Sequence, residues 1–318
     1  MTISRALSNP DKVSKKAKEK IDKVINKRGY IPNLFAGNLK SGKSGLIIVV
    51  IPSLRTSVFN SYYTGIREIL EENKYQPLVG ISDYSLEKEE SIISKFLGYK
   101  PEGIIVVGTK HTKKTKEILL KSNLPLIETW DINHRPLDLI VGFSNYEAGY
   151  NITDYAIQKK YKKILFVTSS DRHMKVETRG RKRLEGYIDR MTKKNYRHTN
   201  FQINDPLDYK KSGEEIFNYY KKNKSKIDCI ITFNEMTGLG FLSTAIRNNI
   251  NIPKDLGVAS IGNAEVSNLL DFKITTINTN QYEMGKLAAS KLIDRINNVP
   301  FKKRIFDVGT SLVKGLSL

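Results

Sequence analysis

The side chains most able to do chemistry form no familiar catalytic or metal-binding pattern in this sequence. The histidines have no spacing that is typical of metal ligands, and no Ser-His-Asp or Cys-His arrangement stands out. The one cysteine, Cys229, lies in the apolar run 227–231, which predicts a buried structural thiol. We therefore expect no enzymatic activity and no metal site. The four histidines are His111, His134, His173 and His198.

Two features of the sequence could indicate phosphate binding: a glycine-containing fragment and a concentration of basic residues. The basic residues give the stronger signal. Gly238-Leu-Gly240 is a fragment of a dinucleotide fingerprint, but its third glycine and the following acidic residue are missing, so we expect no cofactor. Residues 1–44 hold eleven lysines and arginines against three acidic residues, a net +8 of the chain's +20. This concentration predicts binding to a polyanion such as DNA, although general lysine-rich usage explains part of it.

The elements that must position these residues divide the chain into three parts. Residues 1–44 have helical patterns, with Ser14 as a predicted N-cap and Gly29 as a predicted left-handed C-cap. From residue 46, apolar runs of strand length alternate with amphipathic helices, which predicts parallel sheets that are covered on both faces. We expect a head and hinge at 1–44, a first lobe at 45–144 plus 278–304, and a second lobe at 145–277 plus 305–318.

The predicted fold is α/β, with two doubly wound parallel-sheet lobes. Strands are expected at 46–51, 77–81, 103–107, 139–143, 164–168, 227–233 and 256–261, and a helix over 282–297 is expected to return to the first lobe. Ligands bind beyond the carboxyl ends of such strands, so a cleft between the lobes is the expected site. No apolar run is long enough to span a membrane, and no secretory signal precedes the lobes, which favours the cytoplasm.

Several short motifs occur in the order and at the spacing of the lactose-repressor (LacI) family. In the head these are Met1-Thr-Ile-Ser-Arg-Ala-Leu7, Val13-Ser14, Gly29-Tyr-Ile-Pro-Asn33 and Leu39-x-Ser-Gly-x-Ser44. The chain resembles this family along essentially its whole length, and within it the gluconate-utilisation repressors. The closer likeness is carried by Pro52-Ser-Leu54, Ser57-Val-Phe59, Gly108-x-x-His-Thr112, Trp130-Asp131, Val141-Gly-Phe-Ser-Asn145 and Ala148-Gly149.

The resemblance implies a truncated all-α helix-turn-helix head, whose recognition helix enters the major groove. The family's first helix, the turn and the opening of the recognition helix have no counterpart before Met1. We therefore expect weakened operator binding, and coding sequence upstream of Met1. In the family a hinge leucine wedges into the minor groove, and Leu39 holds that position, unless it is an ordinary linker residue. Gly37, where the family usually has arginine, weakens the hinge helix. The implied DNA-binding residues are Thr2, Ser4, Arg5, Tyr30, Asn33 and Leu39.

The resemblance also implies an effector cleft between the lobes. Aromatic rings, hydroxyls and a carboxylate suit a sugar, and arginine forks bind carboxylates in a bidentate manner, so a sugar acid is expected. Two alternative interpretations do not involve a ligand: residues 179–183 could be the solvated start of a helix, and Trp130 could be a core residue. The implied effector-binding residues are Ser53, Arg55, Ser57, Phe59, His111, Thr112, Trp130, Asp131, Arg179, Arg183, Asn234, Glu235 and Glu265. The family often has aspartate at the two glutamate positions.

Together these observations predict a homodimeric repressor that binds a pseudo-palindromic operator and responds to a small sugar or sugar acid. An alternative is a cytoplasmic sugar-binding module that no longer binds DNA. An α/β enzyme has no recognisable motif here, and a periplasmic receptor would need an export signal.

Overall fold

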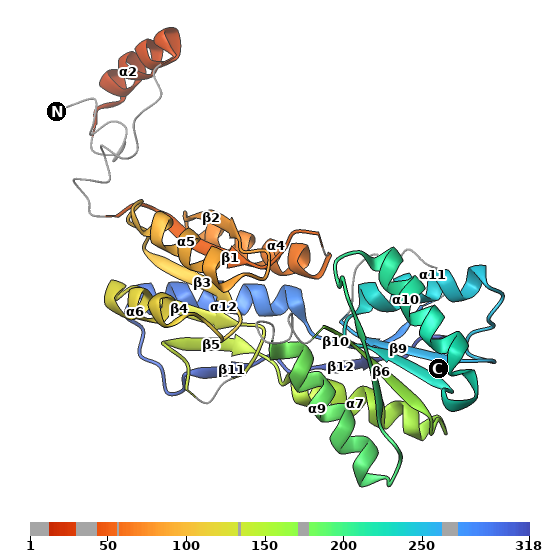
Figure 1. The fold of residues 1–318 in the computed structure, drawn as a ribbon. Coiled ribbons are helices and arrows are strands. Elements are labelled where there is room, and N and C mark those ends of the chain that lie inside the picture. Colours follow the sequence, from red (N-terminus) through yellow and green to blue (C-terminus); the bar gives the residue numbers. More distant parts are fainter. Residues whose placement is uncertain (1–12, 30–42, 56, 133–134, 171–177, 263–272) are drawn as a thin grey trace.

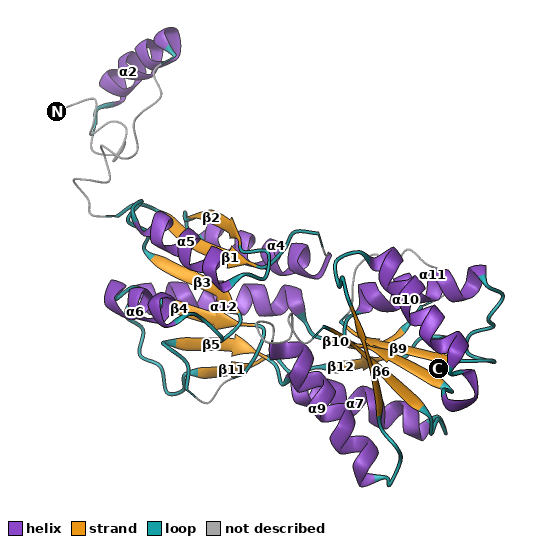
Figure 2. Ribbon diagram, in the orientation of Figure 1, coloured by secondary structure: helices purple, strands orange, loops and turns teal. Residues whose placement is uncertain are grey.

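The computed structural model describes residues 13–29, 43–55, 57–132, 135–170, 178–262 and 273–318, without the side chain of Ser57. Two lobes lie next to each other, and the amino-terminal helix α2 (Lys15–Arg28) stands apart from them (Figure 1). Each lobe contains one six-stranded sheet between helices (Figure 2). The α/β class with two parallel-sheet lobes is as the sequence predicted.

The first lobe is built from residues that alternate between the two faces of its sheet. In β1 (Leu46–Ile51), Ile47, Val49 and Ile51 pack into the core beside α4 (Ser57–Glu72), while Ile48 and Val50 join a second core. That second core lies beneath α5 (Leu86–Leu97) and α6 (Lys113–Ser122). Because every second side chain points to the opposite face, one apolar run serves two helical layers.

The remaining strands of the first sheet follow the doubly wound pattern. They are β2 (Gln76–Ile81), β3 (Gly103–Val107), β4 (Leu126–Thr129), β5 (Leu139–Gly142) and β11 (Ile305–Asp307). The sheet order is β11-β5-β4-β3-β1-β2, with all neighbours parallel. The helix α12 (Gln281–Ile296) packs against α4 and against β3, β4 and β5, and its blue ribbon lies among the orange and yellow elements of this lobe (Figure 1).

The second lobe repeats this arrangement with the middle of the chain. Its sheet has the order β12-β10-β9-β8-β6-β7, and only β12 is antiparallel. One face carries α7 and α9, and the other carries α10 and α11. The strands are β6 (Ile164–Ser169), β7 (Thr199–Ile203), β8 (Cys229–Thr232), β9 (Gly257–Ile261), β10 (Thr275–Asn278) and β12 (Ser311–Val313). The helices are α7 (Asn145–Gln158), α9 (Thr178–Lys193), α10 (Tyr209–Lys222), the short η2 (Lys224–Lys226) and α11 (Glu235–Arg247).

The chain crosses between the lobes three times, after β5, after β10 and after β11. Residues 305–318 were predicted to belong to the second lobe, but β11 pairs with β5 in the first sheet. The crossing therefore comes after Asp307 rather than after residue 304. The short strands β7, β10, β11 and β12 were not predicted. β7, β11 and β12 lie at sheet edges, and β10 begins with two threonines, so their apolar patterns are too weak to be seen in the sequence.

The helix α2 has the predicted ends but no buried partner among the described residues. Gly29 is in the left-handed conformation, with φ 60°, and its N–H donates to the carbonyl oxygen of Ile25. Ser14 is the N-cap by backbone conformation, although its side chain makes no capping hydrogen bond. No residue of this helix is buried; Ala17, Ile21 and Ile25 of its apolar stripe are half-buried, and Val24 is 58% exposed.

Candidate functional site

A pocket opens between the two lobes, at the carboxyl ends of strands from both sheets. Its empty volume is about 760 Å³, which includes space open to solvent. The first lobe contributes Val58, Phe59, Tyr84 and Trp130. The second lobe and the crossing contribute Arg179, Gly180, Arg183, Pro206, Leu207, Tyr209, Phe233, Asn234, Glu235, Met236, Ile261, Gly262 and Thr279.

The first-lobe wall of the pocket is aromatic. The ring of Phe59 lies 4.7 Å from the ring of Trp130, and Tyr62 supports Trp130 from behind at 5.6 Å in an edge arrangement. The Tyr62 hydroxyl is hydrogen-bonded to Thr129 Oγ1 at 2.8 Å, and burial raises the pKa of this hydroxyl well above its usual range. The wall is therefore a rigid, neutral surface on which the apolar face of a sugar ring can stack.

Trp130 has two features that point to a ligand rather than to the core alone. Its backbone is left-handed, with φ 69°. A non-glycine residue adopts this conformation at a cost of about 1–2 kcal/mol. Its indole Nε1 is buried and has no hydrogen-bond acceptor among the described residues. Strain and unpaired donors of this kind concentrate at binding sites. Trp130 is thus both a packed residue, 4% exposed, and part of the pocket wall.

The second-lobe wall is cationic. Arg179 and Arg183 are four residues apart on α9, so they lie on one face of this helix. Both line the pocket, and they are only 7% and 8% exposed. The guanidinium of Arg179 lies 5.5 Å from the ring of Trp130 and 5.8 Å from that of Phe59, across the cleft. The alternative that residues 179–183 are a solvated helix start is wrong for these two arginines. It holds for Arg181, whose side chain is 58% exposed.

Arg183 is held in place by hydrogen bonds at both sides of its guanidinium group. Its Nε donates to Asn145 Oδ1 at 2.9 Å, and its Nη1 donates to the carbonyl oxygen of Phe233 at 2.5 Å. Such contacts fix the plane of the fork, which is what bidentate recognition of a carboxylate requires.

The loop after β8 adds one carboxylate and one amide to this wall. Asn234 caps α11, because its Oδ1 accepts from the N–H of Thr237 at 2.8 Å. The next residue, Glu235, is 2% exposed and lines the pocket. The charged residues of the described lining are therefore two arginines and one glutamate. This net positive charge favours an anionic ligand that also carries hydroxyl groups.

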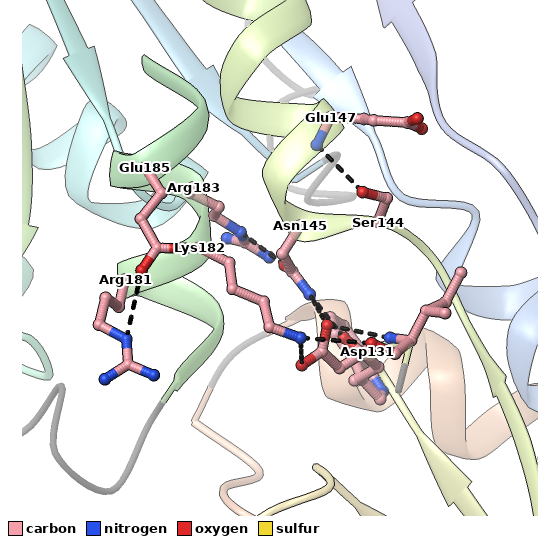
Figure 3. A network of polar contacts seen from close by, with 10 residues as sticks. Asp131, Ser144, Asn145, Glu147, Arg181, Lys182, Arg183 and Glu185 are labelled. Carbon is pink, nitrogen blue, oxygen red and sulfur yellow. Dashed lines mark hydrogen bonds and ion pairs between the residues drawn. The ribbon is translucent and has the colours of Figure 1, made fainter. Parts of the chain in front are cut away.

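A polar network joins the lobes behind the pocket (Figure 3). Lys182 on α9 of the second lobe reaches Asp131 of the first lobe, with 2.6 Å between Nζ and Oδ2. Asn145, at the chain crossing, donates from Nδ2 to the Trp130 carbonyl oxygen at 3.0 Å and to Asp131 Oδ1 at 3.2 Å. Asp131 was predicted to bind the effector, but it belongs to this network and does not line the pocket.

Four other predicted effector residues also lie outside the lining of the pocket. Ser53 is buried and accepts from the N–H of Arg55, and Arg55 is exposed. Thr112 caps α6 and donates to Glu90. His111 lies inside the first lobe, where its Nδ1 contacts Glu89 at 2.6 Å and its Nε2 faces Glu128 at 3.5 Å. A position just after a strand is therefore insufficient to reach the cleft.

The buried group of His111, Glu89 and Glu128 is an ionic cluster of the first lobe. Burial by itself would lower the pKa of His111, but the contacts with Glu128 and Glu89 and their charges outweigh it and raise this pKa to about 9. The imidazolium therefore neutralises part of the buried negative charge at neutral pH. In the described part of the chain, no group of three metal-ligating side chains is suited to hold a metal ion.

Several predicted residues fall outside the residues that the structure describes. These are the six DNA-binding residues (Thr2, Ser4, Arg5, Tyr30, Asn33 and Leu39), together with Glu265 and the side chain of Ser57. Cys229 is buried, and burial raises the pKa of its thiol, as expected for a structural cysteine. No helix among the described residues is long and apolar enough to cross a membrane.

Several residues that the fold brings to the cleft were not predicted from the sequence. Tyr84 follows β2, Tyr209 follows β7, and Thr279 follows β10. All three obey the rule that ligand-binding residues follow parallel strands. Two of them were missed because β7 and β10 were not predicted. Asn145 belongs to a motif noted in the sequence but was not predicted to contact the cleft, and Lys182 gave no signal, because only the packing of α9 against the first lobe brings it to Asp131.

Family models match two segments of the chain. Residues 153–318, more than half of the chain, match the periplasmic binding protein-like domain. Residues 1–33 match the bacterial regulatory proteins of the lacI family. The two matches therefore cover the second lobe with the final crossings and the amino-terminal segment.

Curated relatives and solved structures extend this similarity to the whole chain. The HTH-type transcriptional regulator IdnR of Escherichia coli (strain K12) is 26% identical over 319 residues, covering 100% of this chain and 94% of that protein. GntR of the same strain, also an HTH-type transcriptional regulator, is 25% identical with the same coverage. The crystal structure of a LacI-family transcriptional regulator from Silicibacter pomeroyi has a TM-score of 0.90 at 28% identity, covering 100% of this chain and 95% of that one.

Proposed function

Because this chain belongs to the LacI family of DNA-binding transcriptional regulators, with a periplasmic-binding-protein-like sensor, we propose that it is a repressor controlled by a sugar acid. Its relatives are named as transcriptional regulators, a family without enzymatic activity. The observation that carries the choice of effector is the pair of buried arginines, Arg179 and Arg183, that faces an aromatic wall across the cleft.

The chemistry of the two walls supports an effector that carries both a carboxylate and hydroxyl groups, such as gluconate. The fork of Arg183 is fixed by Asn145 and Phe233, so a carboxylate can bind it without a loss of side-chain freedom. The unpaired Nε1 of Trp130 supplies a donor for a ligand oxygen, and the carboxylate of Glu235 supplies an acceptor for ligand hydroxyls. The proposed effector site consists of Phe59, Tyr84, Trp130, Arg179, Arg183, Asn234 and Glu235.

An effector in this pocket would touch both lobes and would therefore favour one angle between them. Its influence is limited by the difference between its affinities for the two lobe arrangements. We propose a homodimer formed through the lobes, so that a change in this angle alters the spacing of the two amino-terminal segments. Two such segments would bind the two halves of a pseudo-palindromic operator in the cytoplasm.

The proposed contact with DNA rests on the basic amino-terminal segment. Helix α2 carries six lysines and Arg28 against Glu19 and Asp22. Contacts of these cations with phosphates would release counterions, so operator affinity should fall steeply with salt concentration.

A thermal-shift series on the full chain tests the effector. Gluconate at about 100 times its dissociation constant should add about 2.7 kcal/mol to the free energy of unfolding. Glucose, which lacks the carboxylate, is the matched neutral ligand and should add much less. If glucose stabilises the chain and gluconate does not, the assignment of the arginine pair to a carboxylate is wrong.

A second candidate function is a sugar-binding module that does not bind DNA. The incomplete burial of α2 favours it, because no described residue of this helix is buried. Gel shifts of the full chain on a library of duplexes separate the two functions. Enrichment of one sequence supports the repressor, while uniform, salt-sensitive binding supports the module.

A further inference from the structure

Asp131 is a buried acid whose counter-ion comes from the other lobe. It follows β4 of the first lobe and is 1% exposed. Its Oδ1 accepts from the N–H of Ile132 at 2.9 Å, and its Oδ2 accepts from Lys182 Nζ at 2.6 Å. A carboxylate this deeply buried is stabilised only when it is paired, so separation of the lobes would remove its main charge compensation.

Lys182 is the neighbour of the pocket arginine Arg183 on α9. Its side chain is 31% exposed, and its Nζ also donates to the carbonyl oxygen of Ile132 at 3.3 Å. Figure 3 shows this lysine extending from α9 toward Asp131, while Arg181 extends away to Glu185 on the same helix. Of two consecutive residues on α9, Arg183 therefore enters the pocket and Lys182 holds the opposite lobe.

Asn145 connects the ion pair to the pocket. It is fully buried at the start of α7, where the chain crosses between the lobes. Its Nδ2 holds the first lobe through the Trp130 carbonyl oxygen and Asp131, and its Oδ1 holds Arg183 of the second lobe. A single amide thus contacts the backbone of one pocket wall and the guanidinium of the other.

Close backbone packing makes this network stiff. A Cβ on Gly142 would lie 2.2 Å from the Asp131 carbonyl oxygen, so β5 passes directly against the Asp131 backbone. A Cβ on Gly149 would lie 2.0 Å from the Arg183 carbonyl oxygen, so α7 and α9 are in backbone contact. Because both ends of the network are anchored in packed backbone, a change in lobe angle must break or remake its side-chain contacts.

We propose that Asp131, Asn145 and Lys182 form an interlobe clasp that holds the lobes together without an effector and positions Arg183 for ligand binding. The three are positioning residues, since none of them belongs to the pocket lining. The clasp rests on the proposed function in one respect, that the cleft is the effector site. Its effect on lobe angle is independent of which molecule binds.

The single tryptophan of the chain gives a direct measure of the clasp. Trp130 lies in the cleft, 4% exposed, with Arg179 of the second lobe over its ring. Acrylamide quenching of its fluorescence, measured on the full chain without ligand, reports how often the lobes separate. Lys182→Met removes the cross-lobe ion pair and should raise the quenching constant at least about twofold, by shifting the population toward open lobes.

Three further variants make this measurement decisive. Arg181→Met removes the neighbouring ion pair, which stays within α9, and should leave quenching unchanged. Lys182→Arg keeps the charge and should retain low quenching. Asp131→Asn combined with Lys182→Met leaves no unpaired charge at the clasp, so it should fold even if Lys182→Met alone does not, and should again show high quenching. Quenching of the folded double variant equal to that of the wild type would overturn the proposal.

The effector test remains separate from this one. A titration of the wild type and of Lys182→Met with gluconate should give an affinity about tenfold lower for the variant, because open lobes reduce the binding-competent fraction. If the wild type shows no response to gluconate while the quenching results hold, the choice of effector fails and the clasp stands.

Discussion

The two lobes share one sheet topology but present different chemistry to the cleft. Both sheets have the same strand order, and they differ only in that the last edge strand is parallel in the first and antiparallel in the second. The first lobe contributes aromatic rings supported by other rings. The second contributes arginines, of which Arg183 is fixed by hydrogen bonds. Topology therefore determines where a side chain can reach the cleft, and residue type determines what it can bind there.

The supports behind the two walls differ as well. The first lobe has a buried ionic cluster, His111 with Glu89 and Glu128, within its own interior. A second ionic contact lies at the boundary between the lobes, where Lys182 of the second lobe pairs with Asp131 of the first lobe. The His111 cluster should therefore respond to pH within the first lobe alone, whereas the pairing of Lys182 with Asp131 should depend on the angle between the lobes.

The largest effect is expected from the helix contact that positions the arginine wall. Gly149→Ala places a methyl group where the Arg183 carbonyl oxygen lies 2.0 Å away, and backbone cannot yield cheaply. We expect a loss of about 4 kcal/mol or more in the free energy of unfolding, measured by urea denaturation. Gly180→Ala on α9 is the matched control, because its Cβ meets only Phe233 at 3.9 Å. This control should be neutral or slightly stabilising. Equal stability of the two variants would remove the role assigned to the helix contact.

The pH dependence of the first lobe is expected to be the next largest effect. The folded pKa of His111, about 9, lies above its usual value of 6.5. Its contribution to stability is therefore complete below pH 6.5, declines as the pH rises, and is lost above pH 9. The total is about 3 kcal/mol at most. Denaturation of wild type and His111→Gln between about pH 6 and 9.5 should show the two curves converging at high pH.

A histidine of the second lobe provides the control for this comparison. His198, beside β7, is exposed. His198→Gln should follow the wild-type pH profile throughout. Curves for His111→Gln that stay parallel to the wild type would show that the ionic cluster does not titrate in this range.

The arginine wall should contribute more to effector affinity than the aromatic wall. Arg183→Lys keeps the positive charge but loses the planar fork, so gluconate should bind about 100-fold more weakly by calorimetry. Arg181→Lys, outside the pocket, is the control and should bind as the wild type does. If Arg183→Lys changes the affinity for gluconate by less than about threefold, the ligand carboxylate does not bind this guanidinium in a bidentate manner.

The smallest effect is expected on the aromatic side. Phe59→Leu keeps an apolar side chain but removes a ring that lies 5.8 Å from the Arg179 guanidinium. Loss of this cation–π contact should weaken gluconate binding by about three- to fivefold, measured by the same calorimetry. An effect as large as that of Arg183→Lys would reverse the ranking of the two walls.

Much of this molecule follows from local patterns in the sequence. The apolar runs at 46–51 and 103–107 became buried strands, because alternate side chains of an apolar strand can cover both faces of a sheet. The left-handed Gly29 ended α2 as predicted. Arg179, Arg183, Phe59 and Trp130, which the sequence predicted as effector-binding residues, all line the pocket, and their role in binding stays a prediction.

Tertiary structure alone decided which of these residues meet. His111 and Asp131 also follow strands. His111 nevertheless lies inside the first lobe against Glu89 and Glu128, and Asp131 pairs with Lys182 of the opposite lobe. The crossing after Asp307, and the position of Asn145 between Trp130 and Arg183, depend on strand order and on helix contacts between distant segments. Periodicity and capping are local interactions that a sequence displays directly, whereas contacts between lobes arise only once both sheets have formed and packed.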